Sequence, residues 1–180
     1  MTGKKLTAGK SGPAVEPGLG ESVDRNYYNS FILVATDCTA TTGIVPPGRG
    51  ENLTVPGLEY ALLSAKPYSY TQDELQFAVH LCHKNIPASE LKSRRHELLA
   101  DFFGRSRACL RCSSLPKKYG WGIHFDAAGK IGLHAVDSKE YRRFAGDQII
   151  EKFPAMRSQR DRTGKGAPSS LKAWRNAFRE

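Results

Sequence analysis

The strongest constraint on the fold is a run of strictly alternating residues in the second half of the chain. Residues 119–125 (YGWGIHF) place large side chains at every second position, with small or polar residues between them, and residues 131–135 (IGLHA) repeat this pattern. Such alternation is typical of strands with one buried face. The connecting residues include a glycine, which suits the left-handed backbone position of a short turn. We therefore predict a β-hairpin.

The length of the connecting loop sets the register of this hairpin. With a three-residue loop over residues 127–129, every large apolar side chain falls on one face, whereas a loop of two or four residues would scramble the pattern. The expected partners are Trp121 with Ala135, Ile123 with Leu133 and Phe125 with Ile131.

Flanking segments predict further elements. Residues 30–36 (SFILVAT) form a short apolar run that is typical of a buried strand, and residues 39–55, with their prolines and glycines, indicate a loop. A strand or turn is expected near residues 149–153. Four helices are expected: about residue 58 to Pro67, a Thr71/Glu74 capping box to about His83, Ala88 to Gly104, and Asp137 to Gly146.

Together these elements predict one α+β domain, in which a central antiparallel hairpin or small sheet packs against about four helices. A chain of 180 residues has room for a single domain. Residues 1–25 lack apolar periodicity and are expected to be a disordered tail, residues 26–155 the domain, and residues 156–180 a basic tail. Leu171, Trp174 and Phe178 would lie on one side of a short amphipathic helix within that last segment.

Charge and composition indicate the class of partner. The net charge is +9, and residues 152–180 alone hold eight Lys/Arg against two Asp/Glu, which gives +6. This tail suits an acidic protein or a nucleic acid. No apolar run is long enough to span a membrane and no signal region leads the chain, so we expect a soluble, cytoplasmic protein. The four cysteines are then expected to be reduced.

Soft metal ligands are present, but their spacing is incomplete. Cys109 and Cys112 form one close-set pair, while His80, Cys82 and His83 lie on an expected helix where Cys82 turns toward the core. A structural zinc site normally needs two close-set pairs, so we predict no metal. Recognisable enzyme motifs are also missing, since the Gly-Lys-Ser at residues 9–11 lacks the strand and helix of a phosphate-binding loop. The sequence predicts no particular cofactor.

The face of the hairpin opposite the apolar row is lined with small residues and histidines. It carries Gly120, Gly122 and Gly132, with His124 and His134 on adjacent strands. Glycines weaken a strand unless another group must approach its backbone closely. That group is either a ligand or a helix, and a helix would leave the histidines hydrogen-bonded beneath it.

Cations flank the hairpin in the sequence. Arg111, Lys117 and Lys118 precede its first strand, while Arg157 and Arg160 follow the last core element. Arginine binds carboxylate or phosphate in bidentate fashion, so these five groups could converge on an anion. The alternative is a solvated basic rim. The candidate ligand-binding residues are therefore His124, His134, Lys117, Arg157, Arg160 and Gly122.

Three function classes follow. The preferred one is a small non-catalytic binding module for an anionic small molecule or an acidic partner. An enzyme of unrecognised type would use His124 or His134 as acid or base, with Cys109 or Tyr119 nearby. A nucleic-acid-associated protein is third, because the positive charge lies mainly in the C-terminal tail.

Four blocks of the chain carry a family resemblance. They are residues 26–38 (NYYNSFILVATDC), 67–75 (PYSYTQDEL), 108–124 (ACLRCSSLPKKYGWGIH) and 155–160 (AMRSQR). Together they resemble a family of short soluble proteins catalogued only as a domain of unknown function. The resemblance covers roughly residues 26–160 and implies no activity.

Overall fold

The computed structural model describes residues 25–50 and 52–159. The elements follow in the order β1 (Ser30–Leu33), α1 (Val55–Ala65), α2 (Gln72–His83), α3 (Ala88–Phe103), a 3₁₀ turn (Leu110–Cys112), α4 (Ser114–Lys118), β2 (Trp121–Phe125), β3 (Ile131–Ala135), α5 (Lys139–Gly146) and β4 (Glu151–Pro154). The expected tails fall almost entirely outside the described residues and stay predictions. None of the described helices has the length and apolar content needed to cross a membrane.

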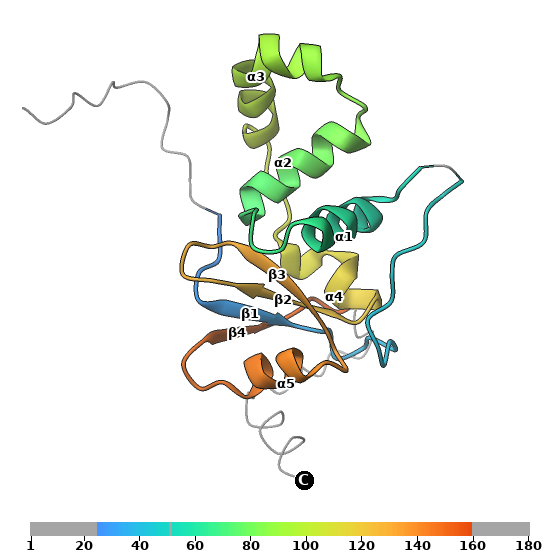
Figure 1. The fold of residues 1–180 in the computed structure, drawn as a ribbon, viewed down its shortest axis with the longest axis vertical. Helices are drawn as coiled ribbons and strands as arrows, with labels where there is room; N and C mark the ends of the chain where they lie inside the picture. Colours follow the sequence, from blue (N-terminus) through green and yellow to red (C-terminus); the bar gives the residue numbers. More distant parts are fainter. Residues whose placement is uncertain (1–24, 51, 160–180) are drawn as a thin grey trace, which may run out of the picture.

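The strands form one four-stranded mixed sheet in the order β3-β2-β1-β4 (Figure 1). The predicted α+β class is confirmed. The hairpin β2–β3 is one half of the sheet, and β1 joins it as an antiparallel neighbour of β2. On its other side β1 pairs in parallel with β4. The carboxyl ends of β1 and β4 therefore meet at the same edge of the sheet.

The predicted register of the hairpin is confirmed. Trp121 pairs with Ala135, Ile123 with Leu133 and Phe125 with Ile131. Gly129 adopts a φ of +72°, the left-handed position that the turn requires. The Asp126 carboxylate accepts the N–H groups of Ala128 and Lys130, both at 2.8 Å, and this fixes the turn from within.

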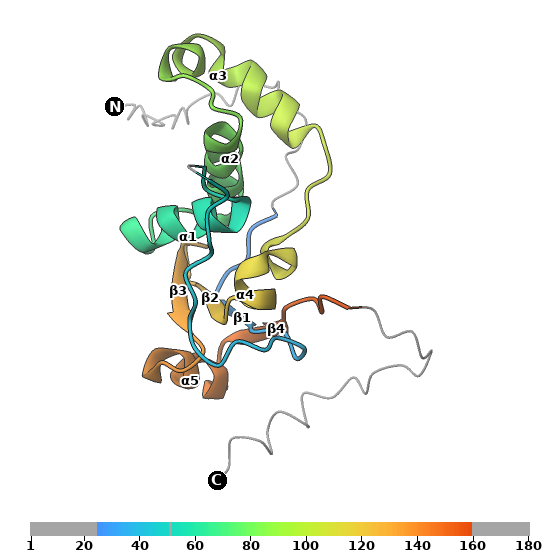
Figure 2. The same ribbon diagram turned by 90° about the vertical axis from the view of Figure 1, so that its right-hand side faces the viewer.

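Two apolar clusters lie on opposite faces of the sheet. On one face, Ile32 and Ile123 pack with side chains from α1, α2 and the 3₁₀ turn: Leu63, Leu75 and Leu110. On the other face, Phe31 and Leu33 pack with Tyr141 and Phe144 of α5. Figure 2 shows these layers from the side, with α1 and α2 above the sheet and α5 below it.

Helix boundaries follow their caps. The capping box of α2 is present, with Thr71 and Glu74 as predicted. Helix α1 begins earlier than expected, at Val55, because the Thr54 side chain caps it and proline is tolerated in a first turn. Helix α5 takes its cap from Ser138 rather than the expected Asp137.

Two elements differ from expectation in the middle of the chain. Helix α4 was not predicted, and Lys117 therefore lies in a short helix and not at the entry of a strand; Ser113 caps this helix by accepting the N–H of Leu115. In α3, only Phe102 is buried, and Arg94 interrupts the helical backbone. Helix α3 has little to pack against, because it lies farthest from the sheet (Figure 1).

The close packing around Gly122 gives a direct test of the fold. A Cβ atom there would lie 2.5 Å from the Phe31 ring and 2.6 Å from the Tyr141 ring. We expect Gly122→Val to destabilise the domain by at least about 2 kcal/mol, because both rings are buried and cannot retreat. Urea denaturation measures this. Gly146→Ala is the matched control, since a Cβ there meets nothing within 4 Å, and equal destabilisation by both changes would contradict the packing described.

Candidate functional site

Side chains of the same chain cover the glycine face of the hairpin. Phe31 and Tyr141 lie against Gly122, and the ring of Tyr68 lies against Gly132, where a Cβ would be only 2.4 Å from it. Both glycines are buried. The close approach that the glycines predicted therefore comes from aromatic rings, and α5 supplies part of this cover.

Both histidines of this face contact one tyrosine. The Tyr68 hydroxyl lies 3.0 Å from Nδ1 of His124 and 3.1 Å from Nε2 of His134. A phenol has one hydrogen to donate, so Tyr68 donates to one ring and accepts from the other. The two rings must then hold opposite protonation at the nitrogens that face the tyrosine. The ring of Phe144 stacks on His124 at 3.9 Å between centroids and lies 4.9 Å from His134.

The backbone holds Tyr68 in an unusual conformation. Its φ of +55° is in the left-handed region, which costs free energy for a residue other than glycine. Two backbone hydrogen bonds fix this segment beside β3. The Tyr68 N–H donates to the Ile131 carbonyl at 2.8 Å, and the Ile131 N–H donates to the Tyr70 carbonyl at 2.9 Å. Tyr68 could not be predicted as part of this site, because its position depends on a contact with β3 and not on local preference.

Burial makes the two imidazoles poor carriers of charge. Desolvation, with a smaller contribution from the neighbouring His124, lowers the pKa of His134 to about 4. Desolvation also lowers the pKa of His124, with Arg143 adding to the effect and Asp126 opposing it. Both rings are therefore neutral at pH 7 and offer an anion hydrogen bonds but no positive charge.

The predicted cations do not join the histidines. Lys117 lies on α4, which Figure 2 shows on the opposite side of the sheet from α5, and Arg157 follows the end of β4. Arg160 lies outside the described residues. The structure thus brings together His124, His134 and Gly122 but separates them from Lys117. Whether any of these residues binds a ligand stays a prediction.

Three cations lie near the common edge where β1 and β4 end: Arg111, Lys117 and Arg157, here called the basic edge. The charges of Lys117 and Arg111 both act on Cys112, whose thiol donates to the sulfur of Met156, the residue before Arg157, at 3.1 Å. Burial nevertheless raises the pKa of Cys112, with Cys109 adding to the rise. The Met156 N–H donates to the Arg111 carbonyl at 2.9 Å, which ties the segment after β4 to the 3₁₀ turn.

Asp37 fixes the backbone that carries Arg157. Its carboxylate accepts the N–H groups of Ser158 at 2.7 Å and Gln159 at 3.1 Å. Desolvation works to raise the pKa of Asp37, but these two hydrogen bonds and the charge of Arg157 outweigh it and lower the pKa. The segment after β4 is thereby held beside the loop after β1.

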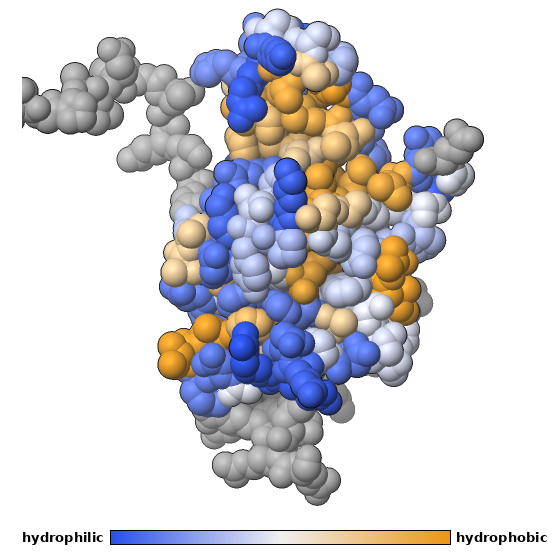
Figure 3. Space-filling view, viewed as in Figure 1, coloured by the Kyte–Doolittle hydropathy of each residue, from blue (hydrophilic) through white to orange (hydrophobic). Residues whose placement is uncertain are grey.

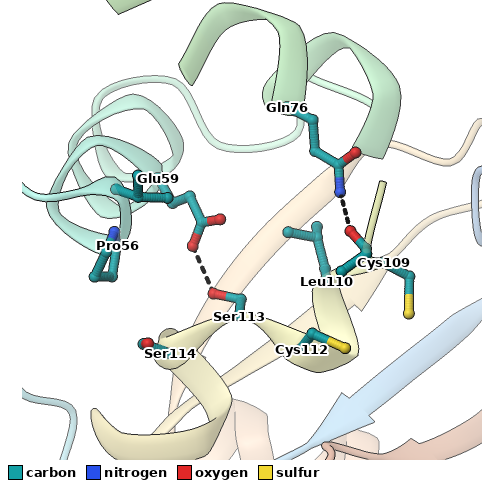
Figure 4. Close-up of a pocket in the computed structure, with 10 residues that line it drawn as sticks. Pro56, Glu59, Gln76, Cys109, Leu110, Cys112, Ser113 and Ser114 are labelled. Atoms are coloured by element: carbon teal, nitrogen blue, oxygen red, sulfur yellow. Dashed lines mark hydrogen bonds between the residues drawn. The ribbon is translucent and has the colours of Figure 1, made fainter. Parts of the chain in front are cut away.

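A partly enclosed pocket of about 250 Å³ lies between α1, α2 and residues 108–114 (Figure 4). Its most unusual group is Glu59 of α1, which is only 8% exposed. The Ser113 hydroxyl donates to its carboxylate at 2.5 Å. Burial raises the pKa of Glu59 to about 7, and the hydrogen bond from Ser113 opposes that rise. Gln76, across the pocket, donates to the Ala108 carbonyl at 2.8 Å.

A second cavity of about 330 Å³ lies near the end of β1, against Tyr141 and Cys38. No charged side chain is among its lining residues. The Tyr141 hydroxyl accepts the Val34 N–H at 3.1 Å, so its oxygen is already engaged. This cavity offers apolar contact and one thiol but no recognition of charge.

Within residues 25–50 and 52–159, no three His, Cys, Asp or Glu side chains are grouped closely enough to hold a metal ion. The prediction that the purified protein carries no stoichiometric zinc is a matter for elemental analysis.

A family model matches residues 22–161 and is described as a family of unknown function, DUF6157. The chain belongs to this family. No curated protein and no solved structure matches the chain significantly. The DUF6157 region contains the whole sheet, the Glu59 pocket and the basic edge, and it confirms the resemblance seen in the sequence. The family description brings no activity with it.

The lowered pKa of His134 predicts how stability responds to pH. The unfolded chain binds a proton near pH 6.5, whereas the folded domain does so only near pH 4, so stability falls as the pH drops through this range. Protonation of His134 should cost the unchanged protein on the order of 2 kcal/mol of unfolding free energy between pH 6.5 and pH 4, after allowance for its partial exposure to solvent. We expect the His134→Gln variant not to show this loss.

Urea denaturation at several pH values compares the variant with the unchanged protein. The difference between them is the proper measure, because Glu59 contributes in the opposite direction: its raised pKa gives stability that is present below about pH 4.5 and lost as the pH rises to 7. Identical pH profiles for the two proteins would show that His134 is freely protonated in the folded domain.

Proposed function

We propose that this domain is a non-catalytic binding module for a small molecule with an anionic group, which binds at the basic edge. The observation that carries this proposal is the parallel pairing of β1 and β4, whose carboxyl ends meet beside Arg111, Lys117 and Arg157. In open sheets with parallel strands, ligands commonly bind beyond these ends.

The cations of this edge are held by the fold. The Nε atom of Arg111 donates to the Pro154 carbonyl at 3.0 Å, and its guanidinium lies 5.7 Å from the centre of the Phe153 ring. A guanidinium held in place loses less conformational freedom when it binds an oxyanion. Arg157 directly precedes Ser158 and Gln159, whose N–H groups Asp37 accepts, and Lys117 belongs to a helix capped by Ser113.

A second group of cations lies on α5 and is less suited to a ligand. Lys139, Arg142 and Arg143 are all exposed on one short helix, and Figure 3 shows a hydrophilic surface over this helix. Arg143 packs over Phe144 at 4.6 Å from the ring centre. These features are typical of a solvated helix face, and they make α5 a useful control.

An enzyme is the second candidate, and one observation favours it. The Tyr68 hydroxyl lies between two neutral imidazoles, an arrangement that could relay a proton between His124 and His134. An acidic protein or nucleic acid that binds the C-terminal tail is a third proposal, and it concerns residues outside the part of the chain that the structure describes.

Binding of inorganic phosphate and citrate tests the preferred function. We expect both anions to raise the melting temperature, because a ligand that binds only the folded state stabilises it. Lys117→Gln and Arg157→Gln should each weaken binding about tenfold, the equivalent of roughly 1.4 kcal/mol for one charge-assisted hydrogen bond. Isothermal titration calorimetry measures the dissociation constants.

Arg142→Gln on α5 is the matched control, since it removes the same charge on the other face of the sheet. This variant should bind phosphate and citrate as tightly as the unchanged protein, and so should a chain that ends at residue 160. Equal weakening by Arg142→Gln would reveal a general charge effect, and loss of binding on removing the tail would move the site away from the domain.

A further inference from the structure

The Glu59 pocket has no part in the proposed anion site, and its chemistry is opposite. Glu59 is the one carboxylic acid among its ten lining residues, which include no lysine or arginine. The other titratable groups around it are the thiols of Cys109 and Cys112. The basic edge acts on Cys112 at the rim of this pocket, whereas burial and Ser113 govern Glu59.

Glu59 has no ion-pair partner in the part of the chain that the structure describes. Among the described residues the ion pairs are Arg94 with Glu90 and Glu97, and Lys130 with Glu74, and none involves Glu59. A carboxylate that is more than nine-tenths buried without a cation is costly in free energy. One hydrogen bond from Ser113 replaces only part of the water that ionisation would need.

The pocket leaves room beside this carboxyl group. Figure 4 shows Glu59 of α1 and Gln76 of α2 projecting toward the same space, with Ser113 and Leu110 below. Val55, Pro56, Ala108 and Leu110 give the remaining wall an apolar character. A carboxyl group at one point of an apolar cavity matches a ligand with one cationic end and a small apolar body.

We propose that this pocket binds a small organic cation, an amine or amidine, whose charged group pairs with the Glu59 carboxylate while its apolar part contacts Val55, Pro56 and Leu110. The ligand supplies a counter-charge that the described residues do not provide. A cavity of about 250 Å³ accommodates a molecule of this kind, and an amidinium can also bind a carboxylate through two parallel hydrogen bonds.

Binding of a cation here must be linked to a proton. In the free protein the pKa of Glu59 is raised by burial to about 7, so the carboxyl group is mostly protonated at pH 6. Pairing with a cation favours the ionised form and lowers this pKa. Complex formation at pH 6 therefore releases close to one proton per bound cation, and the release falls toward zero at pH 8.5.

Calorimetric titration of the full chain with benzamidine and with n-butylamine tests the proposal, with benzamide and n-butanol as neutral analogues of the same shape. Measurement in two buffers of different ionisation enthalpy gives the number of protons released. We expect both cations to bind at least tenfold more tightly than their neutral analogues, with proton release at pH 6.

Glu59→Gln is the decisive variant, because it keeps the shape of the side chain and removes its charge. It should weaken benzamidine binding at least tenfold and leave phosphate binding unchanged. Glu140→Gln, on the exposed surface of α5, is the matched control and should leave both unchanged.

Three results would overturn the proposal: no binding of either cation, equal binding of the neutral analogues, or full benzamidine binding by Glu59→Gln. If that variant does not fold, the neutral analogues decide on the unchanged protein, since equal binding of benzamide and benzamidine excludes a charged partner in this pocket.

Discussion

The parallel pairing of β1 with β4 is the interaction on which the rest of the structure depends. It joins Ser30–Leu33 to Glu151–Pro154 in a register that places Ser30 opposite Glu151 and Leu33 opposite Pro154. Since β1 also pairs with β2, this one central strand connects the hairpin to the end of the domain. The Ala155 N–H extends the pairing to the Leu33 carbonyl, and the Ala35 N–H reaches the Pro116 carbonyl. Helix α4 is thereby attached to the same edge.

The two faces of this sheet meet different needs. One face carries the larger apolar cluster and supports α1, α2 and the 3₁₀ turn, between which the Glu59 pocket forms. The other face is stripped of side chains at Gly122 and Gly132 so that aromatic rings can lie against the backbone. Its histidines stay neutral under Phe144. The two proposed sites for charged ligands therefore lie elsewhere, at the basic edge of the sheet and in the Glu59 pocket of the helical layer.

Local patterns predicted those parts of the fold that local interactions determine. Alternation gave the hairpin register, and the Thr71/Glu74 box gave the start of α2, because both depend on neighbours in the sequence. The partner of β4 could not be predicted, since about 120 residues separate it from β1 and a four-residue strand carries no signal of its partner or direction. Helix α4 could not be predicted because it has only five residues, too few for a periodic pattern.

The same distinction applies to the sites. The hairpin register placed His124 and His134 on one face, but their contacts with Tyr68 and Phe144 join segments that lie apart in the sequence. The burial of Glu59 was weakly indicated by the sequence, since Glu59 precedes Leu63 by one helical turn and so shares a buried face with it. The separation of the cations from the histidines could not be predicted, because a sequence pattern does not indicate which face of the sheet α4 covers.

The claim that anions bind where β1 and β4 end can be tested by titrating the ¹⁵N-labelled protein with inorganic phosphate and following its backbone amide resonances. The largest shifts should cluster at residues 111–118 and 156–159, with little change on α5. Shifts that cluster instead on α5, around Arg142 and Arg143, or around Tyr68 and His134, would contradict anion binding at this edge.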